Sequence, residues 1–279
     1  MNMANVLKRE KQVAVIAALA EGMSIRAIER MTGTNRNTIM SLGVKVGTAC
    51  EKILDERMTG LKGKRFEVDE IWGFIGAKDR NVAYSKHLHY GSVWTFVAVD
   101  ADTKIVPCFK VGKRDADTAN AFIDDLSLRL IDRIQLTADG LGVYIGAVKN
   151  AFDSDGVDFG QLVKTYSGPP ENRNAEARYS PGEVVSVEKG VVFGDPDMDL
   201  VSTSYVESQN LTTRMPIRRL TRLTNAFSKK FENFKAAIGL HFAYYNFVKR
   251  HGTLRMTPAM AAGIEKDFWT VGNLVEAAA

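Results

Sequence analysis

The stretch VDEIWGFIG, residues 68–76, has the apolar alternation of a buried β-strand but contains two adjacent carboxylates. Successive side chains of a strand point to opposite faces, so Asp69 is expected on the face of Ile71 and Glu70 on the face of Trp72. An ionised carboxylate buried without a partner is costly, so the chain must supply a cation, hydrogen-bond donors or a metal. We do not expect the two acids to form one paired site.

The residues around this stretch predict an α/β domain built on a mixed sheet. Pro107 marks the third strand as an edge, because proline cannot donate to a ladder. The Gly-, Pro- and Asp-rich segment at about 167–200, around EVVSVEKGVVFG, predicts an inserted hairpin. The predicted order is β-β-β-α-β-α-β, with strands at 65–76, 93–100, 105–111, 134–139 and 157–165 and helices at 116–130 and 143–152.

Two further acids have positions suited to chemistry. Asp139 ends the fourth predicted strand and is followed at once by Gly140. The carboxyl end of a parallel strand is where α/β sheets place their ligands, although a helix N-cap would explain an aspartate equally well. A helix from about residue 202 carries Glu207, Asn210 and Arg214 on one side, at i, i+3 and i+7. An exposed helix face is the alternative interpretation of that spacing.

The first part of the chain predicts three helices within residues 9–47. Gly22 and Gly33 are expected to end the first two helices. Ser24 and Thr34 are the predicted caps of the second and third. Met31 is expected on the buried face of the second helix, because it continues a helical apolar spacing.

The third of these helices exposes polar residues near its start. Arg36, Asn37 and Ser41 lie off its apolar face. Two short helices joined by a tight glycine turn, with such residues on the second, have the layout of a DNA-reading helix-turn-helix. Arginine can contact guanine and asparagine can contact adenine. A trihelical packing unit without a DNA role is the alternative.

Charge is segregated along the chain, although the net charge is only +4. Residues 1–65 carry +6, residues 66–208 carry −9, and residues 209–256 carry +9. An acidic middle between basic blocks suggests metal chemistry held against a polyanion, although solvated helix faces would give the same count. The candidates for DNA phosphate contacts beside the acidic block are Arg214, Arg218, Arg219, Arg222, Lys229 and Lys230.

Several classes of protein are disfavoured by composition. The chain has no apolar run of 18 residues, so we expect no membrane partner. Its start lacks the apolar core of a signal peptide, so the expected location is the cytoplasm, in association with the nucleoid. Cys50 and Cys108 fit no disulfide framework or zinc-ligand spacing and are expected to be small buried residues.

Several ordered segments resemble the transposase of the insertion sequence 1 family. They include DEIWGFIGAKDRN at 69–81, LTADGLGVY at 136–144 and YVESQNLTTRMPIRRLTRLTNAFSKKFENF from residue 205. The likeness covers roughly residues 65–250. A later segment, NFVKRHGTLRMTPAMAAG, resembles a terminal motif of many bacterial DDE transposases. Residues 81–91 and 167–200 are longer than expected for the family.

The resemblance implies a catalytic triad of Asp69, Asp139 and Glu207. These residues would hold two Mg²⁺ ions, which Mn²⁺ may replace, about 3.5–4 Å apart. One ion would activate water or a 3′ hydroxyl, and the other would stabilise the leaving oxygen. Asn210 and Arg214 match the amide and basic positions that accompany the glutamate, and we expect both to contact DNA.

The predicted architecture is therefore α/β with three parts. A helix-turn-helix domain would occupy residues 1–62, a ribonuclease H-like DDE catalytic domain residues 63–215, and a basic helical region residues 216–279. The implied partners are DNA, as terminal inverted repeats and target, and a second copy of the chain, because two element ends must meet. A helix-turn-helix transcriptional regulator and a catalytically inactive transposase relative are the competing interpretations.

Overall fold

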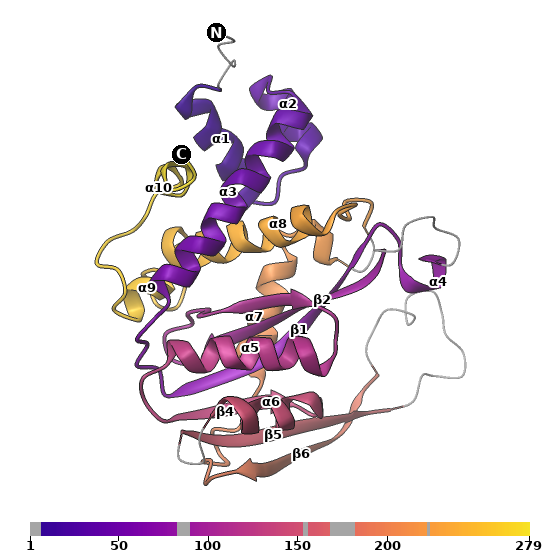
Figure 1. The fold of residues 1–279 in the computed structure, drawn as a ribbon, viewed down its shortest axis with the longest axis vertical. Coiled ribbons are helices and arrows are strands. Elements are labelled where there is room, and N and C mark those ends of the chain that lie inside the picture. The colour runs from indigo at the N-terminus through magenta and orange to yellow at the C-terminus, as the bar shows by residue number, and fades with distance from the viewer. Residues whose placement is uncertain (1–6, 83–89, 153–155, 168–181, 222–223) are drawn as a thin grey trace.

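The computed structural model describes residues 7–82, 90–152, 156–167, 182–221 and 224–279 (Figure 1). These residues form a mixed sheet with helices on both faces. Within this part of the chain the helices are all too short or too polar to cross a bilayer.

The sheet has six strands in the order β3-β2-β1-β4-β5-β6. The central pair β1 and β4 is parallel, as is β4 with β5, and the other neighbours are antiparallel. The predicted order of strands and helices between residues 65 and 165 is confirmed, except that a short unpredicted helix, Asp79–Val82, lies between the first two strands. The strands are β1 (Arg65–Ile75), β2 (Gly91–Asp100), β3 (Phe109–Gly112), β4 (Ile134–Asp139), β5 (Val157–Tyr166) and β6 (Val184–Phe193).

Helices precede, cover and follow this sheet. Helices α5 and α6 pack on one face, while α7 and α8 pack on the other. The helices are α1 (Arg9–Ala20), α2 (Ile25–Thr32), α3 (Arg36–Arg57), α4 (Asp79–Val82), α5 (Ala116–Arg129), α6 (Val143–Ala151), α7 (Ser204–Arg214), α8 (Phe231–Ala243), α9 (Pro258–Ala261) and α10 (Val271–Glu276), with a 3₁₀ turn η1 (Arg218–Leu220) and a π-helix η2 (Tyr244–Val248).

The third strand is shorter than predicted. We expected it at 105–111, but β3 begins only at Phe109. The backbone N–H and C=O of Val106 instead bond the buried side chain of Asn246, at 3.1 and 2.8 Å. Pro107 has no N–H to offer. Both effects remove this segment from the regular ladder.

The predicted inserted hairpin is wrong. The segment EVVSVEKGVVFG forms one strand, β6, which pairs antiparallel with β5 over most of its length. The free edge of β5 presents unpaired backbone groups, and β6 satisfies them. Residues 168–181 lie outside the described residues.

The N-terminal helices follow the prediction in part. Ser24 caps α2 by accepting from the Ala27 N–H at 3.2 Å. Asn35, not Thr34, caps α3, because its side chain reaches the Asn37 N–H at 2.9 Å while Thr34 is buried. Met31 is 70% exposed and is not part of the core. It comes one turn after the last buried position of α2, beyond the packing of the three helices.

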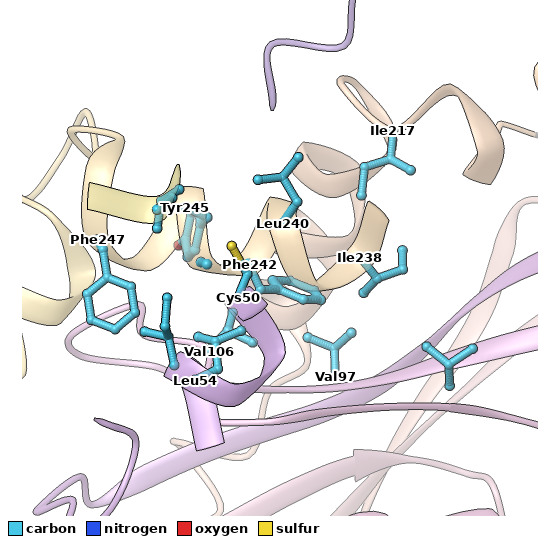
Figure 2. Packing of buried hydrophobic residues seen from close by; sticks show 14 of the residues in the cluster. Cys50, Leu54, Val97, Val106, Ile217, Ile238, Leu240, Phe242, Tyr245 and Phe247 are labelled. Atoms are coloured by element: carbon cyan, nitrogen blue, oxygen red, sulfur yellow. The ribbon is translucent and has the colours of Figure 1, made fainter. Parts of the chain in front are cut away.

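One hydrophobic cluster joins the three predicted parts of the chain. Figure 2 shows Cys50 and Leu54 of α3 beside Phe242 of α8, above Val97 of the sheet. The predicted boundaries at 62 and 215 therefore fall within a shared core. Cys50 and Cys108 are buried free thiols. A smaller cluster of Val15, Ile28 and Ile39 holds α1, α2 and α3 together.

The crossing of α3 and α8 depends on Gly47. A Cβ at this position would lie 2.1 Å from the backbone oxygen of Ala236. We expect Gly47→Ala to reduce the free energy of unfolding by about 1–3 kcal/mol, measured in denaturant, because the helices must move apart. Gly146→Ala is the matched control. Its Cβ would meet nothing within 4 Å in α6, so it should stabilise by about 0.5–1 kcal/mol. Equal effects of the two changes would contradict this packing.

Candidate active site

The register of the central strands brings two predicted ligands together. Strand β1 pairs with β4 so that Val68 lies opposite Ala138. The following residue on each strand is an aspartate, Asp69 and Asp139. Each offers a carboxylate oxygen, together with Glu70, and the three oxygens lie within 4.8 Å of one another.

Glu70 belongs to this group, so the expectation that it could not share a site with Asp69 is wrong. The strand alternation does hold, but it determines where a Cβ points and not where the longer glutamate side chain ends. Its partner is Arg114, whose Nη2 lies 3.2 Å from Glu70 Oε2 and 3.8 Å from Asp139 Oδ2. Burial, with the charge of Asp139 next, raises the pKa of Glu70 to about 7.

Asp69 is held by two donors. Its Oδ1 accepts from the Glu70 N–H at 2.8 Å, and its Oδ2 accepts from Asn210 Nδ2 at 2.7 Å. Burial outweighs these hydrogen bonds and raises the pKa of Asp69 to about 6, and the charge of Asp139 acts in the same direction. Asn210 is 2% exposed. In this arrangement it orients the carboxylate and is not open to DNA.

Asp139 is held by the turn that follows its strand. Its Oδ1 accepts from the Leu141 N–H at 3.0 Å. Helix α6 starts later, at Val143, with Gly142 in the N-cap position, so Asp139 is not its cap. The side chain is 38% exposed. It is therefore the acid of the group most open to solvent.

Glu207 lies beside the three acids but outside their group. Thr203 Oγ1 donates to its Oε1 at 2.6 Å, and Lys164 of β5 forms an ion pair with the same oxygen. The Glu207 charge is close enough to raise the pKa of Asp69, as one of the smaller contributions. The structure thus groups Asp69 and Asp139 with Glu70, while Glu207 lies outside this group and pairs with Lys164.

A fifth acid, Glu67, positions the helix that carries Glu207. It lies on β1, two residues before Asp69 and on the same face. Its Oε2 accepts from the backbone N–H groups of Tyr205 and Val206, at 2.7 and 2.9 Å. These groups belong to the first turn of α7, which has no side-chain cap of its own. Glu67 supplies that cap and complements the helix dipole.

The donor set fits a hard divalent cation. Asp69, Glu70 and Asp139 offer only oxygen atoms, the ligands that Mg²⁺ prefers. Arg114 is the one basic side chain that pairs with the group among the described residues. Glu70 Oε1 is buried, and the buried Tyr144 hydroxyl bonds the Glu70 carboxylate. Three carboxylates facing a single guanidinium leave negative charge that a metal would balance.

The predicted DNA-reading residues lie elsewhere. Arg36, Asn37 and Ser41 are exposed at the start of α3. Figure 1 shows this end of α3 beside α2, at the pole of the molecule away from β6. They are accessible to a partner and do not contribute to the acidic group.

The basic residues after α7 differ in accessibility. Arg218, Lys229 and Lys230 are exposed. Arg219 donates to Ser228 Oγ, and burial lowers the pKa of its guanidinium. Arg214 is half-buried at the end of α7. Arg222 lies outside the described residues.

Four residues of the site were missed or misjudged from sequence: Glu67, Glu70, Arg114 and Lys164. For Glu67 a signal was present, because period-two alternation places it on the face of Asp69. Arg114 and Lys164 come from a loop and from β5, and their distance from the acids depends on tertiary packing that no local pattern reports.

Divalent metal should stabilise the protein in a pH-dependent way. The folded pKa values of Asp69, about 6, and Glu70, about 7, exceed the ordinary values of 3.8 and 4.5. The folded state therefore binds protons more tightly, and the metal-free protein should lose stability as pH rises from about 4 to about 7. Mn²⁺ or Mg²⁺ at ten times its dissociation constant should stabilise by about 1.4 kcal/mol and raise the melting temperature by about 3 °C.

The shift should be larger at pH 8 than at pH 5.5, because protons compete with the metal. Scanning calorimetry of wild type and of Asp69→Asn with Glu70→Gln would measure it. In the double variant both the metal shift and this part of the pH dependence should disappear. A metal shift that survives the substitutions would place the ion elsewhere.

Glu67→Ala should loosen α7. The substitution leaves two buried N–H groups without an acceptor, so the free energy of unfolding should fall by about 1–3 kcal/mol. Amide hydrogen exchange should accelerate at Tyr205 and Val206. Glu67→Gln retains an acceptor oxygen and should lose less, while Glu188→Ala on exposed β6 is the control. Unchanged exchange at Tyr205 and Val206 in Glu67→Ala would refute the cap.

Comparison with known proteins assigns no family to the chain. No family model matches the sequence, and no curated protein matches it. Among solved structures, the chain is similar to the piggyBac transposase in a cryo-EM synaptic complex with hairpin DNA, with a TM-score of 0.46 and 12% identity over 99% of this chain and 72% of that one. A likeness this distant assigns neither a family nor the role of any residue.

Proposed function

We propose that this chain is a DDE-type DNA transposase of a bacterial insertion sequence, which cleaves the ends of the element and joins them to target DNA. One observation carries the proposal. Asp69 on β1 and Asp139 at the end of the adjacent parallel strand β4 converge, and Asn210 of α7 binds Asp69 one turn after Glu207. A transcriptional regulator would not need these converging carboxylates in order to bind DNA.

The order of the sheet supports a ribonuclease H-like assignment. Three antiparallel strands, β1 to β3, are followed by two parallel strands, β4 and β5, with a helix after each of β3 and β4. The helix that carries the last acid then lies across the face of β1. The insertion sequence 1 resemblance implies the same succession of elements.

The proposed mechanism gives each side chain a task. Asp69, Asp139 and Glu207, with Glu70 as an additional candidate, would hold two Mg²⁺ or Mn²⁺ ions. When bound, these ions would activate the attacking oxygen and stabilise the leaving oxygen of an in-line phosphodiester displacement. Asn210 keeps one oxygen of Asp69 oriented. Arg114 offsets the charge of Glu70 and Asp139, and Lys164 brings a positive charge to the side of Glu207, where a phosphate would approach.

DNA would be held by two basic regions. In the proposal, Arg36, Asn37 and Ser41 read the terminal inverted repeats in the major groove. Arg214, Arg218, Arg222, Lys229 and Lys230 are proposed to contact phosphates beside the site. A homodimer or higher oligomer would bring the two element ends together.

A cleavage assay tests the proposal. Wild type would be incubated with Mg²⁺ or Mn²⁺ and a labelled duplex that carries the terminal repeats of the element. We expect metal-dependent nicking at the ends that Asp69→Ala, Asp139→Ala and Glu207→Ala abolish. Glu70→Gln should reduce the rate by about 10- to 100-fold, the range typical of groups that support metal ligands.

Asp132→Asn, at an exposed acid outside the site, is the matched control and should cleave as wild type does. Nicking that survives all three alanine substitutions would refute the site assignment. If wild type binds the repeats but does not nick them, the chain is a regulator or an inactive relative.

A further inference from the structure

A cavity lies behind α7. It has a volume of about 350 Å³ and is lined by side chains from α7, the β2–β3 turn and the loop after η2. Tyr205, Ser208 and Thr212 line it from α7. On a helical wheel these residues are turned away from Asn210, which faces Asp69. The cavity is therefore separated from the candidate active site by the helix itself.

The lining carries positive charge without carboxylates. Lys104, Lys249 and Arg250 all line the cavity, and no Asp or Glu does. None of the three forms an ion pair within the part of the chain that the structure describes. Unpaired basic side chains that converge on one concavity raise the local concentration of anions.

Acids near Lys104 are committed to other partners. Asp102 pairs with Arg65, and Glu67 caps α7. Asp100 accepts from the Thr103 hydroxyl at 2.7 Å and from the Asp102 N–H at 2.9 Å. The positive charge of Lys104 is thus not matched by a carboxylate of its own.

Lys104 has an unusual backbone. Its φ is +61°, a left-handed conformation that glycine and asparagine adopt more easily than lysine. Tyr245 Oη donates to its carbonyl at 2.9 Å and holds the turn in place. The ammonium donates to the Ala101 carbonyl and lies 3.2 Å from the centroid of the Tyr205 ring. The carbonyl and the ring each occupy one of its three protons, so one remains for a ligand.

The loop after η2 supplies the remaining donors. Arg250 is fixed by its Nε, which donates to the Arg255 carbonyl at 2.8 Å. His251 accepts the Leu254 N–H at Nδ1, at 3.4 Å, so its neutral ring carries a proton on Nε2. Burial, then the charges of Lys104 and Lys249, lowers the pKa of His251. Hydroxyls of Ser208 and Thr212 complete a lining rich in donors.

We propose that this cavity binds a phosphate group of the DNA backbone, at a site separate from the acidic centre. Three cations and several neutral donors around a small volume suit a phosphodiester, which accepts hydrogen bonds and carries one negative charge. The anion chemistry follows from the lining alone. That the phosphate belongs to DNA rests on the proposed function. A DNA strand bound there would pass behind α7. The enzyme would then contact DNA on both sides of the helix that carries Glu207.

The test is DNA binding without catalysis. Binding of a fluorescently labelled duplex would be measured by anisotropy in EDTA, over a series of KCl concentrations, for wild type and for Lys249→Gln with Arg250→Gln. We expect affinity to fall about tenfold or more and the slope of log K against log salt to decrease by about 1 for each lost contact. Lys266→Gln, at an exposed lysine outside the cavity, should change neither.

Lys104→Gly distinguishes an effect on folding from an effect on DNA binding. Glycine relieves the left-handed backbone, so thermal stability should be unchanged or higher, while DNA affinity should fall. Inorganic phosphate is the second probe. If phosphate raises the melting temperature of wild type and not of the variants, while DNA binding is unaffected, the cavity serves a free anion and the DNA assignment is overturned.

If affinity, salt slope and the phosphate shift are all unchanged in both cavity variants, the site itself is refuted. The experiment needs no cleavage. A chain that binds DNA through the cavity but never nicks it would refute the proposed function alone.

Discussion

The contact between Glu67 and the first turn of α7 is the interaction on which the candidate site depends. One buried carboxylate on β1 accepts two backbone N–H groups of a helix that starts 137 positions after Glu67 in the chain. Asp69 follows on the same strand, and Glu207 follows on the same helix. The contact therefore fixes the relative position of two acids that no local interaction could bring together. Asn210, bound to Asp69 one turn further along α7, closes the same link from the other side.

The site is also a balance of charge. Asp69, Glu70 and Asp139 lie close together, and each is held in a different way: by an amide, by Arg114 and by a turn N–H. Such a group is unfavourable for folding unless a cation joins it. Functional sites often lower the folding stability of a protein in this way, because they retain side chains that are unfavourable for folding. The large hydrophobic cluster formed by α3, α8 and the sheet offsets this loss of folding stability.

Much of the fold followed from the sequence, and the failures have physical causes. Strand β4 and the start of α5 lie where predicted, because their apolar spacing and the turns beside them agree. Strand β3 was predicted too long because a side chain, Asn246, replaces its ladder from far along the chain. The segment of β6 was predicted to be an inserted hairpin, because its true partner, β5, lies before a long connection. In each case a distant partner decided the outcome.

In the candidate site, too, some residues could be predicted from the local sequence and others depend on distant parts of the chain. Asp69 and Asp139 could be selected from their places in strands, and their proximity follows from the parallel pairing of β1 with β4. Glu70 was misjudged because face alternation describes the backbone and not the reach of a side chain. Arg114 and Lys164 could not have been found, since neither stands in a pattern and both act only through tertiary proximity.

The close crossing of α3 and α8 fixes the distance between the exposed start of α3 and the sheet. Helix α3 has 22 residues and so extends roughly 33 Å, which is about one turn of B-form DNA. Because Gly47 locks α3 against α8, its exposed start cannot swing freely relative to the sheet. Under the proposed function, the length of α3 would set the distance between the two DNA-binding regions. The number of base pairs between the sequence that is read and the bond that is cut would then be set by a helix, not by a linker.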